Sequence, residues 1–279
     1  MTTVQDAPIT IDAFGLTDRG KVRKDNEDHF IVADIHRSVD LLCGSLPAEA
    51  LTHRIGTTGA HLLVVADGVG GGPDGDVASE RTAAAVLSYV GRTAGCFSGL
   101  NVEREHELLS ALEETVQEVH TQLVAEAGGP NRKAPATTLT LVLLVWPRAY
   151  LVHVGDSRAY VRRRGRVQAL TRDQNFGEYM VSVGAWTEEQ AAKSRTAETL
   201  ASAIGGSEMT PTVGLVDLEP GDSLLLCTDG LTKHVSDDRI AEVLALPVDS
   251  RTMAETLLAD ALADGGSDNV SIIVARGVA

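Results

Sequence analysis

Aromatic residues are scarce in this 279-residue chain, at 4% of the total, and basic residues number 24 against 39 acidic ones. The formal charge of −15 argues against a nucleic-acid backbone or an anionic membrane surface as a main partner, because both would be repelled. With few aromatics, core volume must come from Val, Leu, Ile and Ala. This composition suits closely layered sheets and helices and makes a site built on an aromatic cage unexpected.

Long apolar runs and paired cysteines are also missing. No stretch reaches the roughly 18 apolar residues of a membrane span, and residues 1–10 lack a charged start followed by an apolar core. The three cysteines, Cys43, Cys96 and Cys227, are far apart, with no C-x-x-C spacing for zinc or redox chemistry. We therefore expect a cytoplasmic protein with no membrane partner and with reduced, structural cysteines, Cys227 among them in the core.

Short apolar runs separated by Gly, Pro and Asp predict strands at residues 9–16, 61–66, 138–145, 150–154, 158–163, 223–227 and 270–275. Apolar residues spaced three or four apart predict amphipathic helices around residues 83–90, 112–123 and 253–261. Turns at residues 148–149 and 156–158 predict consecutive hairpins, so the sheets are expected to be mainly antiparallel.

One domain is expected over residues 9–276, because the chain has no repeat of solenoid length and no low-complexity linker. Two segments look inserted. Residues 36–58 form a variable loop without clear periodicity, and residues 171–206 are helix-rich between two strand-rich blocks, a position from which they can cover a site.

Four aspartates stand at the ends of apolar runs: Asp67, Asp156, Asp229 and Asp268. A single Asp-Gly at a strand end is usually a turn, so each aspartate alone is more often structural. If the strands pair, however, the four carboxylates gather at neighbouring sheet edges and repel one another unless cations lie between them. Carboxylate oxygens suit Mg²⁺ or Mn²⁺, between which residue type does not select.

Residues 23–28 add a charged cluster near the N-terminus. Most such clusters are solvated surface turns. The functional interpretation is that Glu27 and Asp28 join the metal cluster while the planar guanidinium of Arg23 faces a phosphate.

These motifs together resemble the metal-dependent protein phosphatases of the PPM (type 2C) class, in its bacterial form. The match runs in order through nearly the whole chain, and the ordered set is specific although no single motif is. It comprises residues 15–30 as G-x-x-x-x-G-x-x-R-x-x-N-E-D-x-F with one added position, 65–71 as V-A-D-G-V-G-G, 137–138 as T-T, 155–158 as G-D-S-R, 170–173 as L-T-R-D, 203–206 as A-I-G-G, 227–231 as C-T-D-G-L and 267–270 as S-D-N-V.

The resemblance implies an α+β fold, an α-β-β-α sandwich of two packed, mainly antiparallel sheets flanked by helices, with residues 171–206 as a flap subdomain. It implies two Mn²⁺ or Mg²⁺ ions at one end between the sheets, and a third, weaker ion. The implied roles are metal ligation for Glu27, Asp28 (through water), Asp67 (bridging), Gly68 (carbonyl), Asp156 (third ion), Asp229 and Asp268, and phosphate binding for Arg23. Asp67, Asp229 and Arg23 would be the catalytic residues.

The implied activity is a protein serine/threonine phosphatase in signal transduction. Two ions roughly 3.5–4 Å apart share a water, lower its pKa and clamp the phosphoryl oxygens for in-line attack. The implied partners are phosphorylated proteins and a cognate Ser/Thr kinase, and we expect a monomer.

The chain departs from the family pattern at three positions. Val69 stands where many eukaryotic relatives carry a histidine thought to protonate the leaving group, so water or a group on the metal would take that role. Ala136 replaces a Gly before the paired threonines, and Ser202 replaces an Arg, which puts backbone and flap details in question but not the metal site.

Two other functions compete with this interpretation. Residues 70–75 formally satisfy G-x-G-x-x-G, but residues 91–101 offer no apolar second strand for a dinucleotide-binding unit. The stronger rival is a pseudophosphatase, a phosphoprotein-binding regulator with the same fold and no turnover. The retained Arg23 and acidic residues argue against it.

Overall fold

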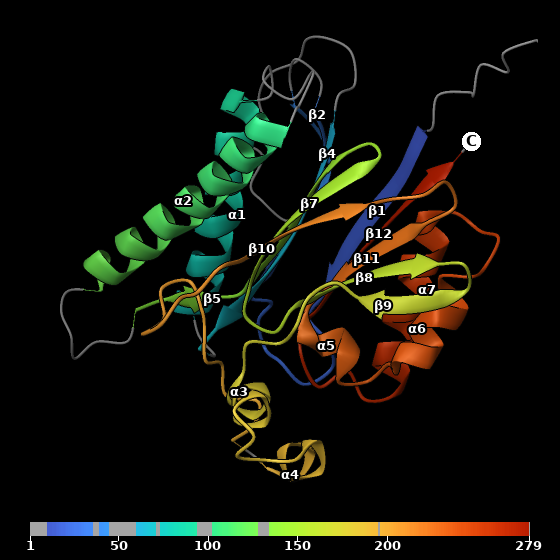
Figure 1. Ribbon diagram of the computed structural model, residues 1–279. Helices are drawn as coiled ribbons and strands as arrows, with labels where there is room; N and C mark the ends of the chain where they lie inside the picture. Colours follow the sequence, from blue (N-terminus) through green and yellow to red (C-terminus); the bar gives the residue numbers. More distant parts are fainter. Residues whose placement is uncertain are drawn as a thin grey trace, which may run out of the picture.

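The computed structural model describes residues 10–35, 39–44, 60–70, 73–93, 102–127, 134–194 and 196–278. Within them two antiparallel β-sheets pack face to face, with helices on the outer face of each sheet (Figure 1). The predicted α-β-β-α sandwich is therefore confirmed.

The first sheet has five strands in the order β1-β12-β11-β8-β9. They are β1 (Thr10–Asp18), β12 (Val270–Val278), β11 (Ser223–Cys227), β8 (Arg158–Arg163) and β9 (Arg166–Ala169), and all their pairings are antiparallel. β8 and β11 have the bounds predicted from the sequence.

The second sheet has seven strands, six of them in the order β10-β7-β6-β4-β2-β3. They are β10 (Thr212–Asp217), β7 (Arg148–Val154), β6 (Leu139–Val145), β4 (Ala60–Val69), β2 (Asp28–Ile35) and β3 (Val39–Gly44), while the short β5 (Ala136–Thr137) pairs with the end of β4.

Helices α1 (Pro73–Thr93) and α2 (Val102–Glu126) cover the second sheet, and α5 (Asp229–Thr232), α6 (Asp237–Val243) and α7 (Ser250–Ala263) cover the first (Figure 1). The short α3 (Phe176–Ser182) and α4 (Glu188–Lys193) lie beyond one end of the sandwich, the end at which α5 begins. Across the described ranges, none of the helices combines the length and the apolar character that a membrane crossing requires.

Strand β4 shows why the central strands read as continuous apolar runs. Its alternate residues Leu62 and Val64 pack under α1 and α2, whereas Leu63 and Val65 pack against the other sheet. Because both faces are covered, all four side chains are fully buried. Strand β2, also buried on both faces, was not predicted, since it follows a charged cluster without a turn between them.

Two details of the predicted hairpins are wrong. Strands β6 and β7 do form a hairpin, but its turn is Trp146-Pro147, because β7 already begins at Arg148. The second turn does not make a hairpin at all. Strands β7 and β8 belong to different sheets, so residues 155–157 carry the chain across the sandwich. Gly155 permits this crossing with a φ of 105°, which favours glycine.

The two inserted segments differ in character. Residues 171–206 contain α3 and α4, as the helix-rich prediction required, and an isolated bridge between Asn175 and Leu200 closes their base. Within residues 36–58 the structure describes only β3, which pairs with β2 although no strand was predicted there. The rest of that segment lies outside the described residues, as does Cys96. Cys227 is a buried free thiol, as predicted.

Candidate metal centre

The centre of the site is a pair of carboxylates on adjacent strands. Asp28 begins β2 and Asp67 lies near the end of β4, and the two are directly opposed in the antiparallel register. Like charges directly opposite each other destabilise a strand pair. Asp28 is buried and Asp67 is partly buried, so the pair requires compensation from elsewhere in the fold.

Asp28 receives that compensation from the other sheet. Its Oδ2 accepts hydrogen bonds from the hydroxyls of Thr228 and Ser271, each at 2.8 Å. Its Oδ1 is buried and has no hydrogen-bond partner. Burial raises the pKa of Asp28 to about 7, the two hydroxyls oppose that rise, and the charges of Asp229 and Asp268 add to it.

The backbone of Asp67 is clamped by the paired threonines. The amide N–H of Thr138 and the hydroxyl of Thr137 both donate to the Asp67 carbonyl, at 2.9 and 2.8 Å, and the Asp67 N–H donates to Thr138 Oγ1 at 3.1 Å. Burial, and then the charges of Asp28 and Asp229, raise the pKa of the Asp67 carboxyl well above its usual range. The two threonines thus hold the backbone of Asp67 in place, although neighbouring acids repel its carboxylate.

Glu27 lies where the first helix approaches the strand end. Its carbonyl accepts a 3.2 Å hydrogen bond from the Gly68 N–H, and its own N–H donates to Asn269 Oδ1 at 2.9 Å. A Cβ on Gly75, in the first turn of α1, would lie 2.6 Å from Glu27 Oε2. Glycines at 68 and 75 therefore let the strand, the helix and this carboxylate come together.

Asp229 opens helix α5, directly after β11. The next residue, Gly230, sits so close to β12 that a Cβ there would be 1.9 Å from the Asn269 carbonyl oxygen. Asp229 Oδ1 is buried without a hydrogen-bond partner, while Oδ2 lies 2.6 Å from Lys233 Nζ. Burial raises the pKa of Asp229 despite that ammonium, with Asp268 adding to the rise.

Asp268 is surrounded by cations. Arg23 Nε lies 2.7 Å from its Oδ1 and Arg23 Nη2 donates to its Oδ2 at 2.9 Å, while Lys233 Nζ donates to the same Oδ2 at 2.8 Å. Burial acts to raise the pKa of Asp268, but the hydrogen bonds and charges of Lys233 and Arg23 outweigh it, and the pKa is lowered.

Asp156 follows the crossing between the sheets, at the base of the flap. The flap is tied to this point by Gln174, whose side chain accepts from the Gly155 N–H at 3.0 Å, and by a bidentate pair between Arg158 and Asp173. Burial and the charge of Asp229 raise the pKa of Asp156 to about 7. Asp156 therefore belongs electrostatically to the cluster.

The residues fit divalent metal ions by the chemistry of their donors. The donors are carboxylate oxygens, two of which are buried without partners, and the repulsion among the carboxylates is the kind that hard cations relieve. Within the described residues, no three acidic, histidine or cysteine side chains already surround a single point as a finished ligand set. Asp229 and Asp268 instead share Lys233.

Sequence reasoning missed several residues that shape the cluster. Thr228 and Ser271 stood inside quoted or adjacent motifs, but no local signal shows that they reach Asp28, 200 and 243 residues away. Lys233 did carry a signal, because it follows Asp229 by four residues at a helix start, the spacing of a helical ion pair.

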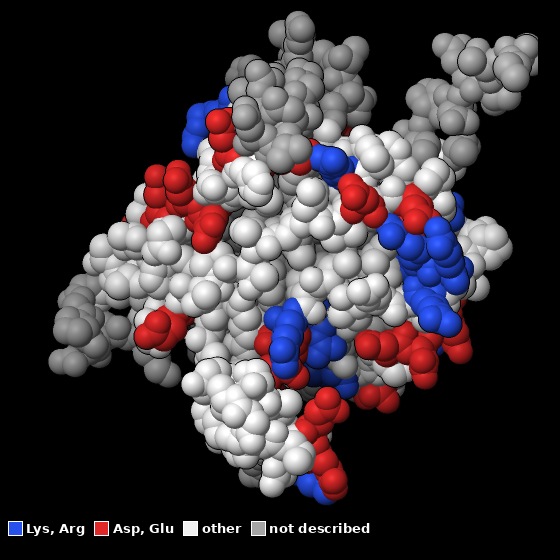
Figure 2. All heavy atoms as spheres, in the orientation of Figure 1, with Lys and Arg blue, Asp and Glu red and all other residues white. Residues whose placement is uncertain are grey.

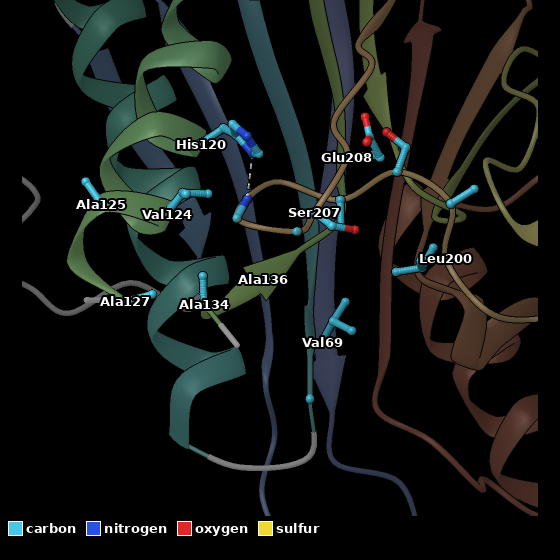
Figure 3. A pocket seen from close by; sticks show the side chains of 16 residues that line it. Val69, His120, Val124, Ala125, Ala127, Ala134, Ala136, Leu200, Ser207 and Glu208 are labelled. Carbon is cyan, nitrogen blue, oxygen red and sulfur yellow. Dashed lines mark hydrogen bonds between the residues drawn. The ribbon is translucent and has the colours of Figure 1, made fainter. Parts of the chain in front are cut away.

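A groove of about 1010 Å³ opens beside the strand end that carries Val69 (Figure 3). Its walls are mainly Ala, Gly and Val from α2, residues 134–136 and residues 200–208, and His120 accepts a 3.1 Å hydrogen bond from the Gly205 N–H. The clustered aspartates do not line it. The groove neighbours the acidic cluster but is a separate feature, and Val69 presents no proton donor to it.

Known proteins resemble this chain in sequence over most of its length. The sequence profile of the family described as Protein phosphatase 2C matches residues 45–264. The serine/threonine protein phosphatase PstP of Mycobacterium tuberculosis is 35% identical over 218 residues, which cover 78% of this chain and 40% of PstP. The chain thus spans less than half the length of that relative.

Solved structures resemble it over nearly its whole length. A serine/threonine phosphatase of S. agalactiae superposes with a TM-score of 0.78 at 26% identity, covering 96% of this chain and 99% of that one. The catalytic domain of PstP, solved with two manganese ions, gives a TM-score of 0.70 at 31% identity over 97% of this chain and 100% of that one. The ordered motifs, the sandwich and these matches lead to one conclusion: the chain belongs to the protein phosphatase 2C family.

Proposed function

We propose that this chain is a metal-dependent serine/threonine protein phosphatase that hydrolyses phosphoserine and phosphothreonine in other proteins. The observation that carries the proposal is the partly buried carboxylate cluster between the sheets, in which the buried atoms Asp28 Oδ1 and Asp229 Oδ1 have no hydrogen-bond partner. Family membership supports it, as do the two manganese ions in the PstP catalytic domain.

In this proposal the cluster holds two Mn²⁺ or Mg²⁺ ions. Asp67 is the shared ligand, Asp229 and Asp268 complete one site, and Glu27 with the Gly68 carbonyl completes the other. Asp28 acts through water, and Asp156 with Asp229 holds a third, weaker ion. When bound, the ions supply a water of lowered pKa and positive charge beside the phosphoryl oxygens.

Arg23 has the position and shape to bind the phosphate. Its side chain is 43% exposed at the rim of the cluster, and its guanidinium already holds a carboxylate with two nitrogens. The same planar fork fits two phosphate oxygens. We therefore assign the substrate phosphate to Arg23, beside Asp268.

A covalent phosphoenzyme is not part of this proposal, because the neighbouring nucleophiles are already committed. Burial raises the pKa of Cys227 to about 12, which leaves a neutral thiol in the core. The hydroxyls of Thr228 and Ser271 donate to Asp28. Direct attack by water is the chemistry these residues leave available, with the leaving alkoxide protonated by water or by a group on the metal.

The partners follow from the same proposal. Acidic and basic clusters lie around a broad area with few charged side chains on the face in Figure 2, and the net charge of −15 disfavours nucleic acid. We propose phosphorylated proteins as substrates, a Ser/Thr kinase as the source of the phosphate, and a monomeric, cytoplasmic protein acting in signal transduction.

The test is hydrolysis of a small aryl phosphate and a phosphothreonine peptide by the purified chain, with Mn²⁺, with Mg²⁺ and with EDTA. We expect release of phosphate with either metal and none with EDTA. No metal-dependent release, together with retained binding of the phosphopeptide, would establish the rival function of a phosphoprotein-binding pseudophosphatase.

A further inference from the structure

The ammonium group of Lys233 lies between two carboxylates of the cluster. Its Nζ is 2.6 Å from Asp229 Oδ2 and 2.8 Å from Asp268 Oδ2. The Lys233 side chain is 31% exposed, so one side of the ammonium meets solvent while the other faces the two acids. Among the cations of the described residues, Lys233 contacts both carboxylates, whereas Arg23 contacts Asp268.

This position is fixed by the backbone. Lys233 is the C-cap that follows helix α5, and its N–H donates to the Asp229 carbonyl at 2.9 Å, which places the two side chains on one face of the turn. Gly230 holds the same turn against the Asn269 carbonyl, one residue beyond Asp268. The two acids and the lysine therefore come from segments packed too closely to move apart freely.

Lys233 occupies one oxygen of each of the two carboxylates, Asp229 and Asp268. Asp268 Oδ1 already accepts from Arg23 and from the Asn269 N–H, at 2.7 and 2.9 Å. Asp268 Oδ2 and Asp229 Oδ2 both contact Lys233, and Asp268 Oδ2 also accepts from Arg23 Nη2 at 2.9 Å. An ion that binds Asp229 Oδ2 or Asp268 Oδ2 must displace the ammonium, and an ion that enters at the unpartnered Asp229 Oδ1 still meets the charge of Lys233 across the same carboxylate.

We propose that Lys233 is a built-in counter-ion that holds Asp229 and Asp268 together and competes with a divalent ion for them. It is a positioning residue, and it sets a weak metal affinity at this one site. The proposal rests on the proposed function only in taking Asp229 and Asp268 as metal ligands.

Two measurable consequences separate competition from a merely structural role. Without metal, loss of the ammonium leaves two carboxylates facing each other, so the protein melts at a lower temperature. With metal, the ion no longer displaces a cation, so it binds more tightly. A lysine that only supports the fold would give the first effect without the second.

The experiment compares Lys233→Met, which keeps the chain length without the charge, with Lys233→Arg, which keeps the charge. The matched control is Lys193→Met, because Lys193 makes an exposed ion pair with Glu189, also four residues away, at 2.5 Å. Calorimetric titration with MnCl₂ gives the affinity, and thermal melting in EDTA gives the metal-free stability. Hydrolysis is measured separately.

For Lys233→Met we expect Mn²⁺ to bind about tenfold more tightly at one site, the size expected when two charge-assisted hydrogen bonds need not be broken. We also expect a lower melting temperature in EDTA. Lys233→Arg should restore values close to the wild type, and Lys193→Met should change neither. If Lys233→Met does not fold, the same measurements are made on Lys233→Gln, which also lacks the charge.

An affinity within twofold of the wild type, or a weaker one, would overturn the proposal even if the melting temperature falls. Absence of Mn²⁺ binding in both proteins would overturn it together with the ligand assignment. Mn²⁺ binding that tightens in Lys233→Met without any hydrolysis by the wild type would uphold this inference and remove the proposed phosphatase function.

Discussion

The two halves of the acidic cluster compensate their negative charge in different ways. Asp28 accepts hydrogen bonds from the neutral hydroxyls of Thr228 and Ser271, and its pKa rises to about 7. Asp268 is held by the cations Arg23 and Lys233, and its pKa is lowered. Burial outweighs the two hydroxyl hydrogen bonds at Asp28, whereas the hydrogen bonds and charges of Lys233 and Arg23 outweigh burial at Asp268.

This difference indicates what each half needs. In the hydroxyl-held half, Asp28 and Asp67 repel each other, and only a proton or an added cation relieves that repulsion. In the cation-held half, the charges of Asp229 and Asp268 are already balanced by Arg23 and Lys233. A divalent ion that binds there meets these two cations. Four substitutions or conditions test this comparison, taken from the largest expected effect to the smallest.

Asp67→Asn removes the central charge of the hydroxyl-held half. We expect turnover to fall by about 10³-fold, on the order of 4 kcal/mol, because the shared metal ligand is lost. The metal-free protein should melt about 3 °C higher, since repulsion with Asp28 and Asp229 disappears. Steady-state kinetics and melting in EDTA measure the two effects.

The control for that variant is Asp238→Asn, which changes an exposed acid in the first turn of α6. It should leave turnover and melting nearly unchanged. Normal turnover in Asp67→Asn would show that Asp67 is not the shared ligand.

Thr228→Val removes one of the two hydroxyls that hold Asp28. It also leaves the Ser271 N–H, which donates to Thr228 Oγ1 at 2.9 Å, without its acceptor. We expect a loss of about 2 kcal/mol in the free energy of unfolding, measured in urea, because buried polar groups lose partners. Thr232→Val, at the end of helix α5, which begins directly after Thr228, is the control. An equal loss of unfolding free energy in both variants would mean that the hydrogen bond from Thr228 to Asp28 adds no stability of its own.

Arg23→Ala removes one of the two cations from the cation-held half. If Arg23 binds the phosphate alike in the ground state and the transition state, KM should rise about tenfold with little change in kcat. Arg19→Ala, an exposed arginine in the same loop, should leave KM unchanged. A fall in kcat alone would point instead to stabilisation of the transition state.

The pH dependence of the metal-free protein reports the raised pKa values directly. Asp28 and Asp156 have folded pKa values of about 7 against 3.8 unfolded. Above pH 4 the unfolded state has lost these protons while the folded state keeps them, so stability falls as pH rises through 7. His29, His120 and His153, whose pKa values burial lowers, act in the opposite direction, but mainly below about pH 6.5.

Between pH 6.5 and 8 we therefore expect the melting temperature of the metal-free protein to fall by about 2 °C. Asp156→Asn should flatten that fall, since one titrating group is gone. Added Mn²⁺ should raise the melting temperature more at pH 8 than at pH 6.5, because protons compete with the metal. A melting temperature that rises across this range in both proteins would contradict the raised pKa values.

Much of the fold was predictable because its signals are local. Strands β8 and β11 had their bounds read correctly from apolar runs between turns. The β7 to β8 connection was not predictable, because a short turn looks the same whether the next strand pairs with the last or crosses to another sheet. The assignments of the metal ligands stay predictions that the experiments above test.

The order and spacing of the motifs determined the family, the sandwich and the set of acidic residues, because each motif is a short stretch that can be recognised without its partners. The tertiary structure alone decided how each acid is held. Asp28 meets Thr228 and Ser271 across 200 and 243 residues of sequence, and Arg23 meets Asp268 across 245. Contacts of that range exist only once the sheets have packed, which is why the two kinds of compensation became visible only in the folded protein.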